Sequence, residues 1–525
     1  MKRILLSYLV LFPVAIFSQV DTRTIDVIDY EVFLKVSDSS NRIEVDEWIR
    51  FFWLDTSRTV VFDLTSVDES GKGMKVDHII ESGDTLTFEQ RENKLFFTPM
   101  VVDANGEVNI QLHFSGIPAD GLVISENKFG DRTFFGDNWP NRAHNWFACL
   151  DHPSDKATIS FQIQAPEKYD VVSVGKLLLD EKRGMDHYFV LRSNVPIPTK
   201  VMVVGIADFS FYHIGSASGV QITNAVYIGE NEDVHEDMEV SAPILDFFED
   251  YIAPYEFEEL ENVQSTTRYG GMENAGCIFY DENAFNGRLT GEDLLAHEIA
   301  HQWFGNSATE SDWPHLWLSE GFATYFTNLY IRSKYGEEAF DQQLQKDRKK
   351  VLQFAESYEH PVVDTVYSEI ETLLNANAYQ KGSWVLHMLH YQLGDSVFKK
   401  CIQEYYGEFR LANASTSDLQ SIFEKVSGVD LDQFFRQWLY TSGHPELKVT
   451  LVGKRKVCKL RIEQVQKQAP FQFPLMIRFT LKKGEVINRE FQINSRYQEF
   501  TLELDEPISD VKIDPGTDLL FRLVK

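Results

Sequence analysis

The sequence predicts a multidomain protein with an all-β domain, a mainly helical domain and a smaller β domain, in that order along the chain. At 525 residues the chain is longer than one hydrophobic core normally supports. Apolar residues alternate with polar ones in the first and last parts, whereas in the middle they recur at helical spacing. The change of period places the three domains at residues 19–211, 212–443 and 444–525.

Strands are expected where period-two alternation is bounded by Gly, Pro, Asn or Asp. In the first domain these segments are Val27–Val36, Ile43–Trp53, Asn109–Phe114 and Ile159–Ile163. In the last domain they are Leu447–Leu451, Leu460–Val465, Met476–Leu481 and Phe500–Leu504. The short last domain therefore predicts a small β-sandwich.

The middle domain carries apolar residues at helical spacing in Ser383–Leu393, Val397–Phe409 and Leu419–Val426. For the last of these, Thr416 or Ser417 is the expected N-cap, and Gly428 lies just past the end. A mainly helical domain follows from these segments.

The first eighteen residues have the pattern of a signal peptide. Lys2 and Arg3 precede an apolar run, and Ser18 precedes a polar continuation. A buried N-terminal strand is the alternative. We expect residues 1–18 to be removed and the mature protein to be periplasmic or extracellular. No later stretch reaches the ~20 apolar residues of a membrane-spanning helix, so no stable membrane span is expected.

The chain is strongly acidic, with a formal net charge of −30. This charge disfavours nucleic acid and anionic membranes as partners and favours cationic peptides; a solvated acidic surface without a specific partner is the simpler interpretation. Four cysteines lie far apart and match no metal-binding spacing. Disulfide pairing and buried free thiols both remain open for them.

Residues 290–305 predict one helix that carries a metal site, with Thr290 as its N-cap and Gly305 at its end. His297 and His301 are four residues apart, so both imidazoles leave one face of the helix and can reach one metal ion. Glu298 lies beside the first histidine, offset around the helix, where it can act on a water without being a ligand.

A catalytic zinc needs a third protein ligand and an open fourth position. Glu320 follows His301 at a distance that lets a second helix aim its carboxylate back at the same ion. One zinc per chain is therefore expected, held by His297, His301 and Glu320. Zinc would activate a water, and Glu298 would serve as general base. The oxyanion would need a further donor, which composition alone does not identify.

These residues, taken with others, resemble the zinc aminopeptidase family of the gluzincin type, which includes aminopeptidase N and leukotriene hydrolase. The segment Gly270, Gly271, Met272, Glu273 and Asn274 precedes the two-histidine helix, as in that family. Further segments resemble family landmarks in the same order, namely 151–156, 172–176 and 379–382. The resemblance implies a thermolysin-like catalytic domain and peptide substrates with a free N-terminus.

The resemblance also implies roles for individual residues. Glu273 would bind the α-amino group of the substrate, within the substrate-binding segment 270–274. Gly270 and Gly271 lack side chains, so this segment can pair with a peptide main chain as an added strand. Tyr379, followed by Lys and Gly, stands where the family places its oxyanion-stabilising tyrosine.

Two departures from the family stand out. A glutamine that usually helps to hold the substrate amine is replaced in the stretch 136–142, where Asn138 or Trp139 is expected to line the subsite instead. Many relatives also carry a large helical domain after the small β domain, whereas this chain ends without one. A three-domain form is implied, with a more open active site that admits longer or bulkier peptides.

Several alternatives stay open. A zinc endopeptidase uses the same two histidines and distant glutamate, and a non-catalytic peptide-binding scaffold could retain the fold. Epoxide hydrolysis rests on family analogy alone. The oligomeric state and the preferred first residue are not readable from this sequence.

Overall fold

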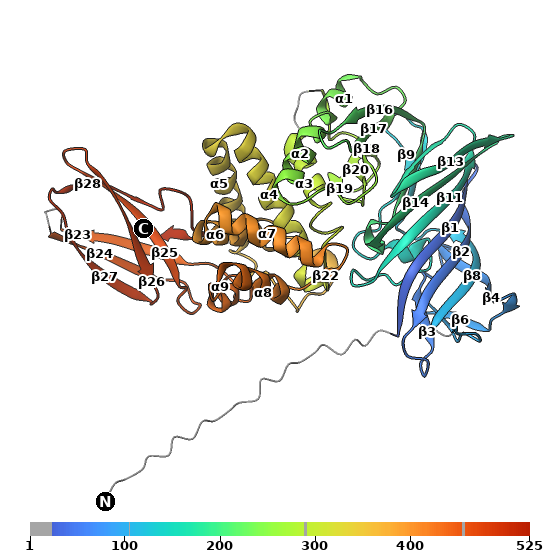
Figure 1. Ribbon diagram of the computed structural model, residues 1–525, viewed down its shortest axis with the longest axis horizontal. Helices are drawn as coiled ribbons and strands as arrows, with labels where there is room; N and C mark the ends of the chain where they lie inside the picture. Colours follow the sequence, from blue (N-terminus) through green and yellow to red (C-terminus); the bar gives the residue numbers. More distant parts are fainter. Residues whose placement is uncertain (1–23, 104, 288–290, 454–456, 525) are drawn as a thin grey trace, which may run out of the picture.

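The computed structural model describes residues 24–103, 105–287, 291–453 and 457–524. The predicted signal peptide and Thr290 lie outside these ranges. Figure 1 shows a β-rich N-terminal region at one end, a helical region in the middle and a C-terminal β region at the other end. The predicted fold class is confirmed by this arrangement.

The N-terminal region is built on an eight-stranded sheet in the order β13-β14-β11-β1-β2-β8-β4-β5. All four strands expected here lie in this sheet, as β1, β2, β8 and β11. Alternate residues of β1, among them Tyr30, Val32 and Leu34, are buried, as period-two alternation requires. The strands are β1 (Ile25–Ser37), β2 (Ser40–Trp53), β4 (Gly73–Glu81), β5 (Asp84–Thr85), β8 (Glu107–Ile117), β11 (Lys156–Pro166), β13 (Lys176–Arg183) and β14 (Asp186–Pro198).

Two smaller sheets complete this region. One has the order β12-β15-β10-β9 and the other β3-β7-β6. Two short 3₁₀ helices, η1 and η2, lie in the connections. The bounds are β3 (Val60–Asp63), β6 (Phe88–Arg91), β7 (Lys94–Phe97), β9 (Leu122–Glu126), β10 (Arg132–Gly136), η1 (Ala143–Asn145), β12 (Asp170–Ser173), η2 (Thr199–Val201) and β15 (Val204–Ala207).

A five-stranded sheet joins the N-terminal region to the helices, in the order β16-β17-β18-β20-β19. The predicted boundary between residues 211 and 212 falls inside its first strand. Its last strand, β19, has two residues and, among the described strands, pairs with β20 alone, so it forms the edge of this sheet. The strands are β16 (Phe209–Gly215), β17 (Gln221–Tyr227), β18 (Leu260–Ser265), β19 (Gly271–Met272) and β20 (Cys277–Asp281).

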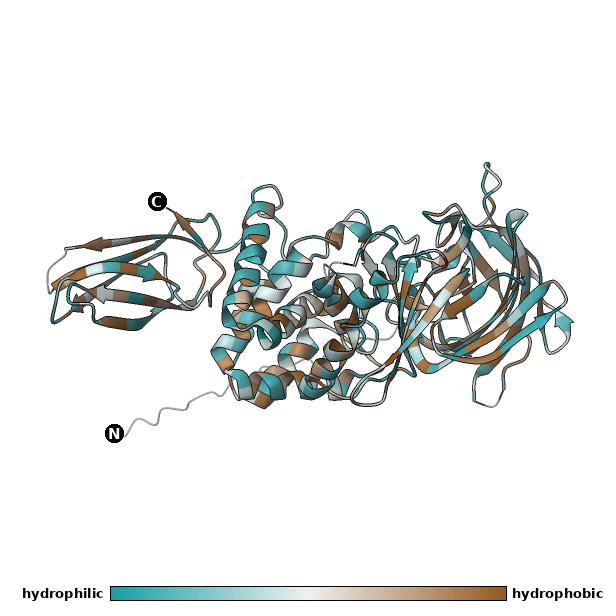
Figure 2. Cartoon of the chain, turned by 90° about the horizontal axis from the view of Figure 1, so that it is seen from above, coloured by the Kyte–Doolittle hydropathy of each residue, from teal (hydrophilic) through white to brown (hydrophobic). Residues whose placement is uncertain are grey.

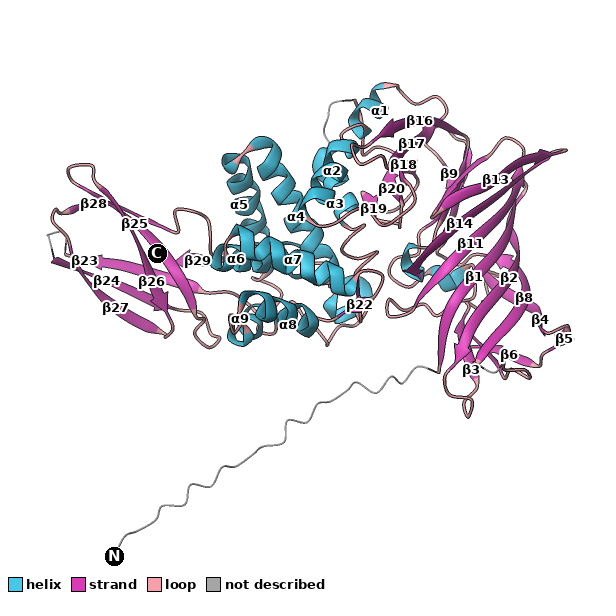
Figure 3. Cartoon of the chain, viewed as in Figure 1, coloured by secondary structure: helices cyan, strands magenta, loops and turns pink. Residues whose placement is uncertain are grey.

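Helices dominate the middle of the chain, between β20 and β23 (Glu446–Val452), as Figure 3 shows. The three segments with helical spacing form α6, α7 and α8. The helices are α1 (Asp233–Met238), α2 (Ser241–Tyr251), α3 (Glu292–Ala300), α4 (Trp317–Tyr335), α5 (Glu337–Phe354), α6 (Gly382–Leu393), α7 (Asp395–Phe409), α8 (Thr416–Ser427) and α9 (Asp432–Leu439). Shorter elements are β21 (Thr309–Glu310), η3 (Trp313–His315), η4 (Ile370–Leu373), the π-helix η5 (Asn377–Lys381) and β22 (Asn413–Ala414).

Two helix boundaries differ from the prediction. The helix expected to run to Gly305 ends at Ala300, because the chain then turns back and the Gly305 amide donates to Ala308. The N-cap of α8 is Ser415 rather than Thr416 or Ser417. Ser415 forms a capping box with Asp418, which satisfies two backbone amides at the helix start.

The C-terminal region is a sandwich of two sheets, with orders β27-β24-β23-β29 and β26-β25-β28. Hydrophobic and hydrophilic residues alternate along its strands in Figure 2. All four predicted strands are present, as β23, β24, β25 and β27. The bounds are β23 (Glu446–Val452), β24 (Val457–Gln464), β25 (Phe473–Leu481), β26 (Val486–Ile493), β27 (Tyr497–Glu503), β28 (Ile508–Ile513) and β29 (Arg522–Val524).

The buried side chains form two hydrophobic cores. One fills the N-terminal region and reaches Met272 and Phe279 of the five-stranded sheet. The other runs from the helices into the C-terminal sandwich. All four cysteines are buried free thiols, which settles the question that the sequence left open. Within the described ranges, no helix is long and apolar enough to cross a membrane.

Candidate metal centre

The two histidines of α3 meet as their spacing predicts. His297 stands in the last turn of the helix and His301 is its C-cap residue. The Nε2 atoms of the two rings lie 3.2 Å apart. Glu320, in the first turn of α4, places Oε2 at 3.5 Å from His297 Nε2 and 3.4 Å from His301 Nε2. The three side chains therefore converge on one point.

These separations fit a zinc ion. Bonds of about 2.0–2.2 Å in tetrahedral geometry put ligand atoms roughly 3.3–3.5 Å apart. In addition, Glu320 Oε2 is buried and receives no hydrogen bond from any described residue. A buried carboxylate oxygen without a hydrogen-bond donor is stabilised by a bound cation. The donor set of two imidazoles and one carboxylate is typical of catalytic zinc.

The proton arrangement on His301 also favours metal binding. Its Nδ1 lies 3.0 Å from the carbonyl oxygen of Phe304, so Nδ1 carries the proton and Nε2 presents its lone pair to the site. Ser319 Oγ lies 3.0 Å from the same Nδ1. Gly305 makes this approach possible, because a Cβ there would lie 2.4 Å from Ser319 Oγ and its φ of 124° disfavours other residues.

Carboxylates dominate the electrostatics of the site. Burial lowers the pKa of His301, but the negative charges of Glu320 and Glu273 outweigh burial and raise this pKa to about 10. Burial also opposes ionisation of Glu320, yet His301 and His297 hold the pKa of that carboxyl well below its usual range. The site therefore favours positive charge, which a divalent cation supplies more fully than a proton.

Glu298 lies beside the ligands on α3 and is buried. Burial raises the pKa of its carboxyl, and the charges of Glu273 and Glu320 raise it further. A carboxylate with a raised pKa suits a general base near neutral pH. Gly271 of β19 passes so close that a Cβ on it would lie 2.3 Å from Glu298 Oε1. A side chain at this position would therefore displace the Glu298 carboxylate.

Glu273 follows β19 directly and is buried next to Glu298 and His301. Its side-chain Oε1 receives no hydrogen bond from any described residue. Its backbone is held firmly, because Gln302 Nε2 donates to the Glu273 carbonyl at 3.1 Å and Asn306 Nδ2 donates to the same oxygen. Burial raises the pKa of the Glu273 carboxyl.

Tyr379 reaches the site from the π-helix η5. Its ring stacks on the His297 ring, with centroids 5.9 Å apart and an angle of 13° between the planes. Burial raises the pKa of its hydroxyl, and the charge of Glu320 raises it further. The hydroxyl therefore stays protonated and can donate a hydrogen bond.

A cavity of about 270 Å³ opens beside these groups. Four of the five residues in the predicted substrate segment line it. Asn274 is fully buried and lies outside the lining, so its role in binding stays a prediction. The lining consists of Trp139, Tyr269, Gly270, Gly271, Met272, Glu273, Leu294, His297, Glu298, Glu320, Leu374 and Tyr379.

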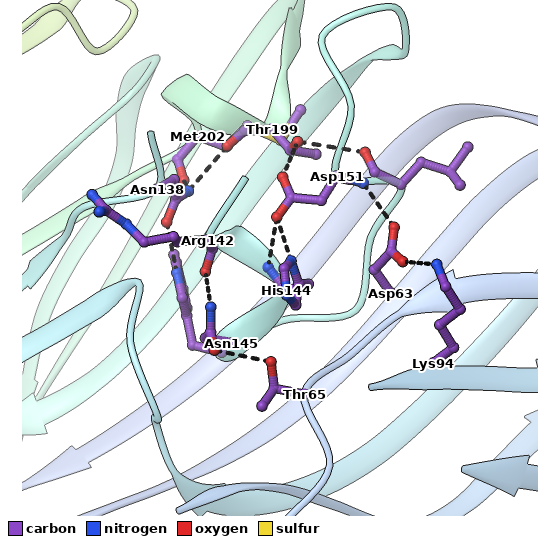
Figure 4. Close-up of polar contacts among 12 residues, drawn as sticks. Asp63, Thr65, Lys94, Asn138, Arg142, His144, Asn145, Asp151, Thr199 and Met202 are labelled. Carbon is purple, nitrogen blue, oxygen red and sulfur yellow. Dashed lines mark hydrogen bonds and ion pairs between the residues drawn. The ribbon is translucent and has the colours of Figure 1, made fainter. Parts of the chain in front are cut away.

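Of the two residues expected in place of the missing glutamine, only Trp139 lines the cavity. Its ring contacts Tyr269 and Trp313 edge to face. The expectation for Asn138 is wrong, because its amide nitrogen donates to the carbonyls of Thr199 and Met202 at 3.0 and 2.6 Å (Figure 4). Asn138 thus links β10 to η2 within the N-terminal region.

The landmark that begins at Asp151 belongs to the same buried network. Its carboxylate accepts hydrogen bonds from the His144 ring at 2.7 Å and from Thr199 Oγ1 at 2.8 Å (Figure 4). This landmark therefore belongs to the N-terminal region's hydrogen-bond network and does not line the cavity.

Sequence reasoning missed four residues of the site. Gln302 anchors Glu273, and Tyr269, Leu294 and Leu374 form walls of the cavity. Gln302 lies next to His301 in sequence, and this position beside a predicted ligand was a usable signal. Tyr269 and Leu374 offered none, since single apolar residues in loops are ordinary.

The three converging side chains form a ligand set of the kind that catalytic zinc sites use. Residues 236–438 match the sequence model of the peptidase family M1 domain. Homologues of the chain are named aminopeptidases.

Three relatives illustrate the similarity. The chain is 29% identical to a glutamyl aminopeptidase of Rattus norvegicus, over 66% of this chain and 38% of the relative. It is 30% identical to aminopeptidase M1 of Arabidopsis thaliana, over 62% of this chain and 38% of the relative. It is 26% identical to a probable aminopeptidase 2 of Sulfurisphaera tokodaii, over 94% of this chain and 63% of the relative. The chain thus spans less than two thirds of each of these relatives.

Proposed function

We propose that this protein is a zinc-dependent aminopeptidase that removes the first residue of a peptide. The observation that carries the proposal is the position of Glu273, a buried carboxylate with a free oxygen beside the three metal ligands. Names of relatives support an aminopeptidase, and the ligand geometry supports zinc.

His297, His301 and Glu320 would hold the zinc. When bound, zinc supplies a Lewis acid that polarises the substrate carbonyl and makes water a nucleophile near neutral pH. Glu298 accepts the proton of the attacking water and delivers it to the leaving amine. Tyr379 donates its hydroxyl proton in a hydrogen bond to the oxygen that becomes negative.

Glu273 distinguishes the first residue from all others. A free α-ammonium group pairs with its carboxylate in a charge-assisted hydrogen bond. An internal peptide bond presents a neutral amide there and leaves the buried carboxylate without a partner. The edge strand β19 offers backbone groups to the peptide main chain, as in strand addition.

The cavity walls indicate the class of first residue. Trp139, Tyr269, Met272 and Leu374 are apolar or aromatic, and no Lys or Arg is among the described lining residues. Because three carboxylates already face the cavity, an acidic first residue would be repelled. We therefore propose a preference for large apolar first residues, although one relative is named a glutamyl aminopeptidase.

A panel of fluorogenic aminoacyl substrates tests this function. Wild-type protein should cleave leucyl and phenylalanyl substrates faster than glutamyl ones, and a chelator should abolish the activity. Glu273→Ala should raise KM strongly while bound zinc is retained. Activity that survives complete zinc removal would overturn the proposal.

A zinc endopeptidase is the nearest alternative, since it would use the same three ligands. It predicts equal cleavage of free and N-acetylated peptides, whereas the Glu273 carboxylate predicts cleavage of the free form alone.

We further propose that the protein is exported. The support is the basic start, the apolar run and the small residue at position 18. Sequencing the N-terminus of the protein secreted by its producing cells should give Gln19 as the first residue, and a chain that keeps Met1 would contradict export by cleavage.

A further inference from the structure

Two glycines bring the backbones of the metal-ligand helix and the tyrosine segment into direct contact. Gly321 follows Glu320 on α4, and Gly382 is the first residue of α6, directly after η5. A Cβ on Gly321 would lie 2.9 Å from Gly382 Cα and 3.0 Å from the Ala378 carbonyl oxygen. A Cβ on Gly382 would lie 3.0 Å from Gly321 Cα. Carbon atoms normally stay about 3.5–4.0 Å apart, so neither position admits a side chain without a shift.

Backbone conformation does not explain these glycines. Both stand in helices, and Gly382 has φ of −56° and ψ of −48°, which any residue adopts. Glycine inside a helix is less favourable than alanine. The close contact is therefore what glycine provides at both positions.

The other side of η5 is held by Lys381. This lysine is buried, and its Nζ donates to the carbonyl oxygens of Gly443 at 2.9 Å and Thr441 at 3.4 Å. Both carbonyls belong to the segment between α9 and β23. The five-residue π-helix that carries Tyr379 is thus fixed between α4 on one side and the segment leading to the C-terminal sandwich on the other.

We propose that Gly321, Gly382 and Lys381 are positioning residues that set the distance of the Tyr379 hydroxyl from the metal ligands. This inference rests on the proposed function, in which Tyr379 stabilises the oxyanion. The glycine contact brings η5 close enough for the Tyr379 ring to stack on His297, and the Lys381 hydrogen bonds tie η5 to the segment between α9 and β23.

A side chain at Gly382 would displace η5 more than α4. The first four turns of α4 are buried throughout, whereas Tyr379 and Gln380 of η5 are partly exposed. The strain therefore moves Tyr379 while Glu320 keeps its place. A misplacement of about 1 Å costs up to about 10²-fold in rate.

The test compares wild type with Gly382→Ala on a leucyl substrate and on an α-aminophosphonate, which mimics the tetrahedral intermediate. We expect kcat to fall by about 10–100-fold while KM and bound zinc stay close to wild type. The inhibition constant of the phosphonate should rise by a similar factor, because only the charged tetrahedral form needs the tyrosine.

Two comparisons separate positioning from a general structural effect. Gly407→Ala adds the same methyl group to helix α7, where nothing lies within 4 Å of the new Cβ, and should leave all parameters unchanged. In the double variant Gly382→Ala/Tyr379→Phe, the loss should not exceed that of Tyr379→Phe alone, since the glycine acts through the tyrosine. If Gly382→Ala does not fold, Lys381→Met gives the same test from the other side of η5.

The outcomes distinguish this inference from the function on which it rests. Zinc-loaded wild type that hydrolyses no aminoacyl substrate would overturn both. An active wild type whose kcat and phosphonate affinity are unchanged in Gly382→Ala would overturn the positioning role alone. Additive losses in the double variant would also overturn it.

Discussion

The metal ligands and the groups proposed to handle the peptide stand on different kinds of backbone. All three ligands come from the regular helices α3 and α4, within one buried core. Glu273 follows a two-residue edge strand, Tyr379 stands in a π-helix, and Trp139 comes from a loop of the N-terminal region. Local helix periodicity therefore sets the spacing of the two histidines, and the packing of α3 against α4 adds Glu320. The groups proposed to handle the peptide instead stand on short or irregular segments that come from distant parts of the chain.

This difference has consequences for how each half responds to change. Ligand positions should tolerate alterations elsewhere in the fold, because α4 is buried along its first four turns. The positions of Glu273 and Tyr379 should respond to contacts such as those of Gln302 and Gly382. In experiment, zinc binding and peptide turnover should therefore change independently of each other.

Glu298→Gln should have the largest effect. The amide keeps the shape of the side chain but cannot accept the water proton, so kcat should fall by about 10²–10⁴-fold. Zinc content, measured by atomic emission, should match wild type because Glu298 is not a ligand. Loss of zinc together with activity would show that Glu298 is needed to hold the metal.

Tyr379→Phe should lower kcat by about 10²–10³-fold, as expected for one oxyanion donor. The hydroxyl is the only group removed, so KM and bound zinc should change little. Tyr497→Phe, at an exposed tyrosine of the sandwich, is the matched control. Equal turnover by Tyr379→Phe and wild type would remove Tyr379 from the chemistry.

Much of this organisation was predictable from the sequence, and the limits have physical causes. Period-two alternation identified β1, β2, β8 and β11, because a strand with one buried face must alternate. Helical spacing placed His297 and His301 on one face, since four residues make about one turn. Asn138 was misassigned because nothing local indicates that its amide is used by backbone carbonyls about sixty residues away.

Other features lie beyond any local pattern. The contact between Gly321 and Gly382 joins segments 61 residues apart, and the sequence shows only two ordinary glycines. The end of α3 at Ala300 depends on the turn that lets Ser319 approach His301. Tertiary packing decides both, so they become visible only in the folded chain.

Ser319→Ala tests a residue that holds one of the three metal ligands, His301, in place. Ser319 Oγ lies 3.0 Å from His301 Nδ1 and helps to orient that ring. Its removal should weaken zinc affinity by about 10-fold or somewhat more, as for other groups that orient a ligand. Titration with a competing chelator measures this. Ser383→Ala, at a buried hydroxyl without a described partner, should leave the affinity unchanged.

Trp139→Ala should have the smallest effect. The effect should be confined to selectivity for the first residue of the substrate. The cavity loses an aromatic wall, so kcat/KM for phenylalanyl substrates should fall by about 10-fold relative to alanyl ones. Zinc content and activity on alanyl substrates should stay near wild type. A uniform loss across all substrates would show that Trp139 supports the fold and does not select the first residue.

The most direct test of an aminopeptidase that recognises a free amine uses one decapeptide in two forms. Zinc-loaded wild-type protein is incubated with the free peptide and with its N-acetylated copy, and the products are read by mass spectrometry. The account predicts successive loss of single residues from the free peptide and no cleavage of the acetylated one. Internal cuts, or equal cleavage of both forms, would contradict it.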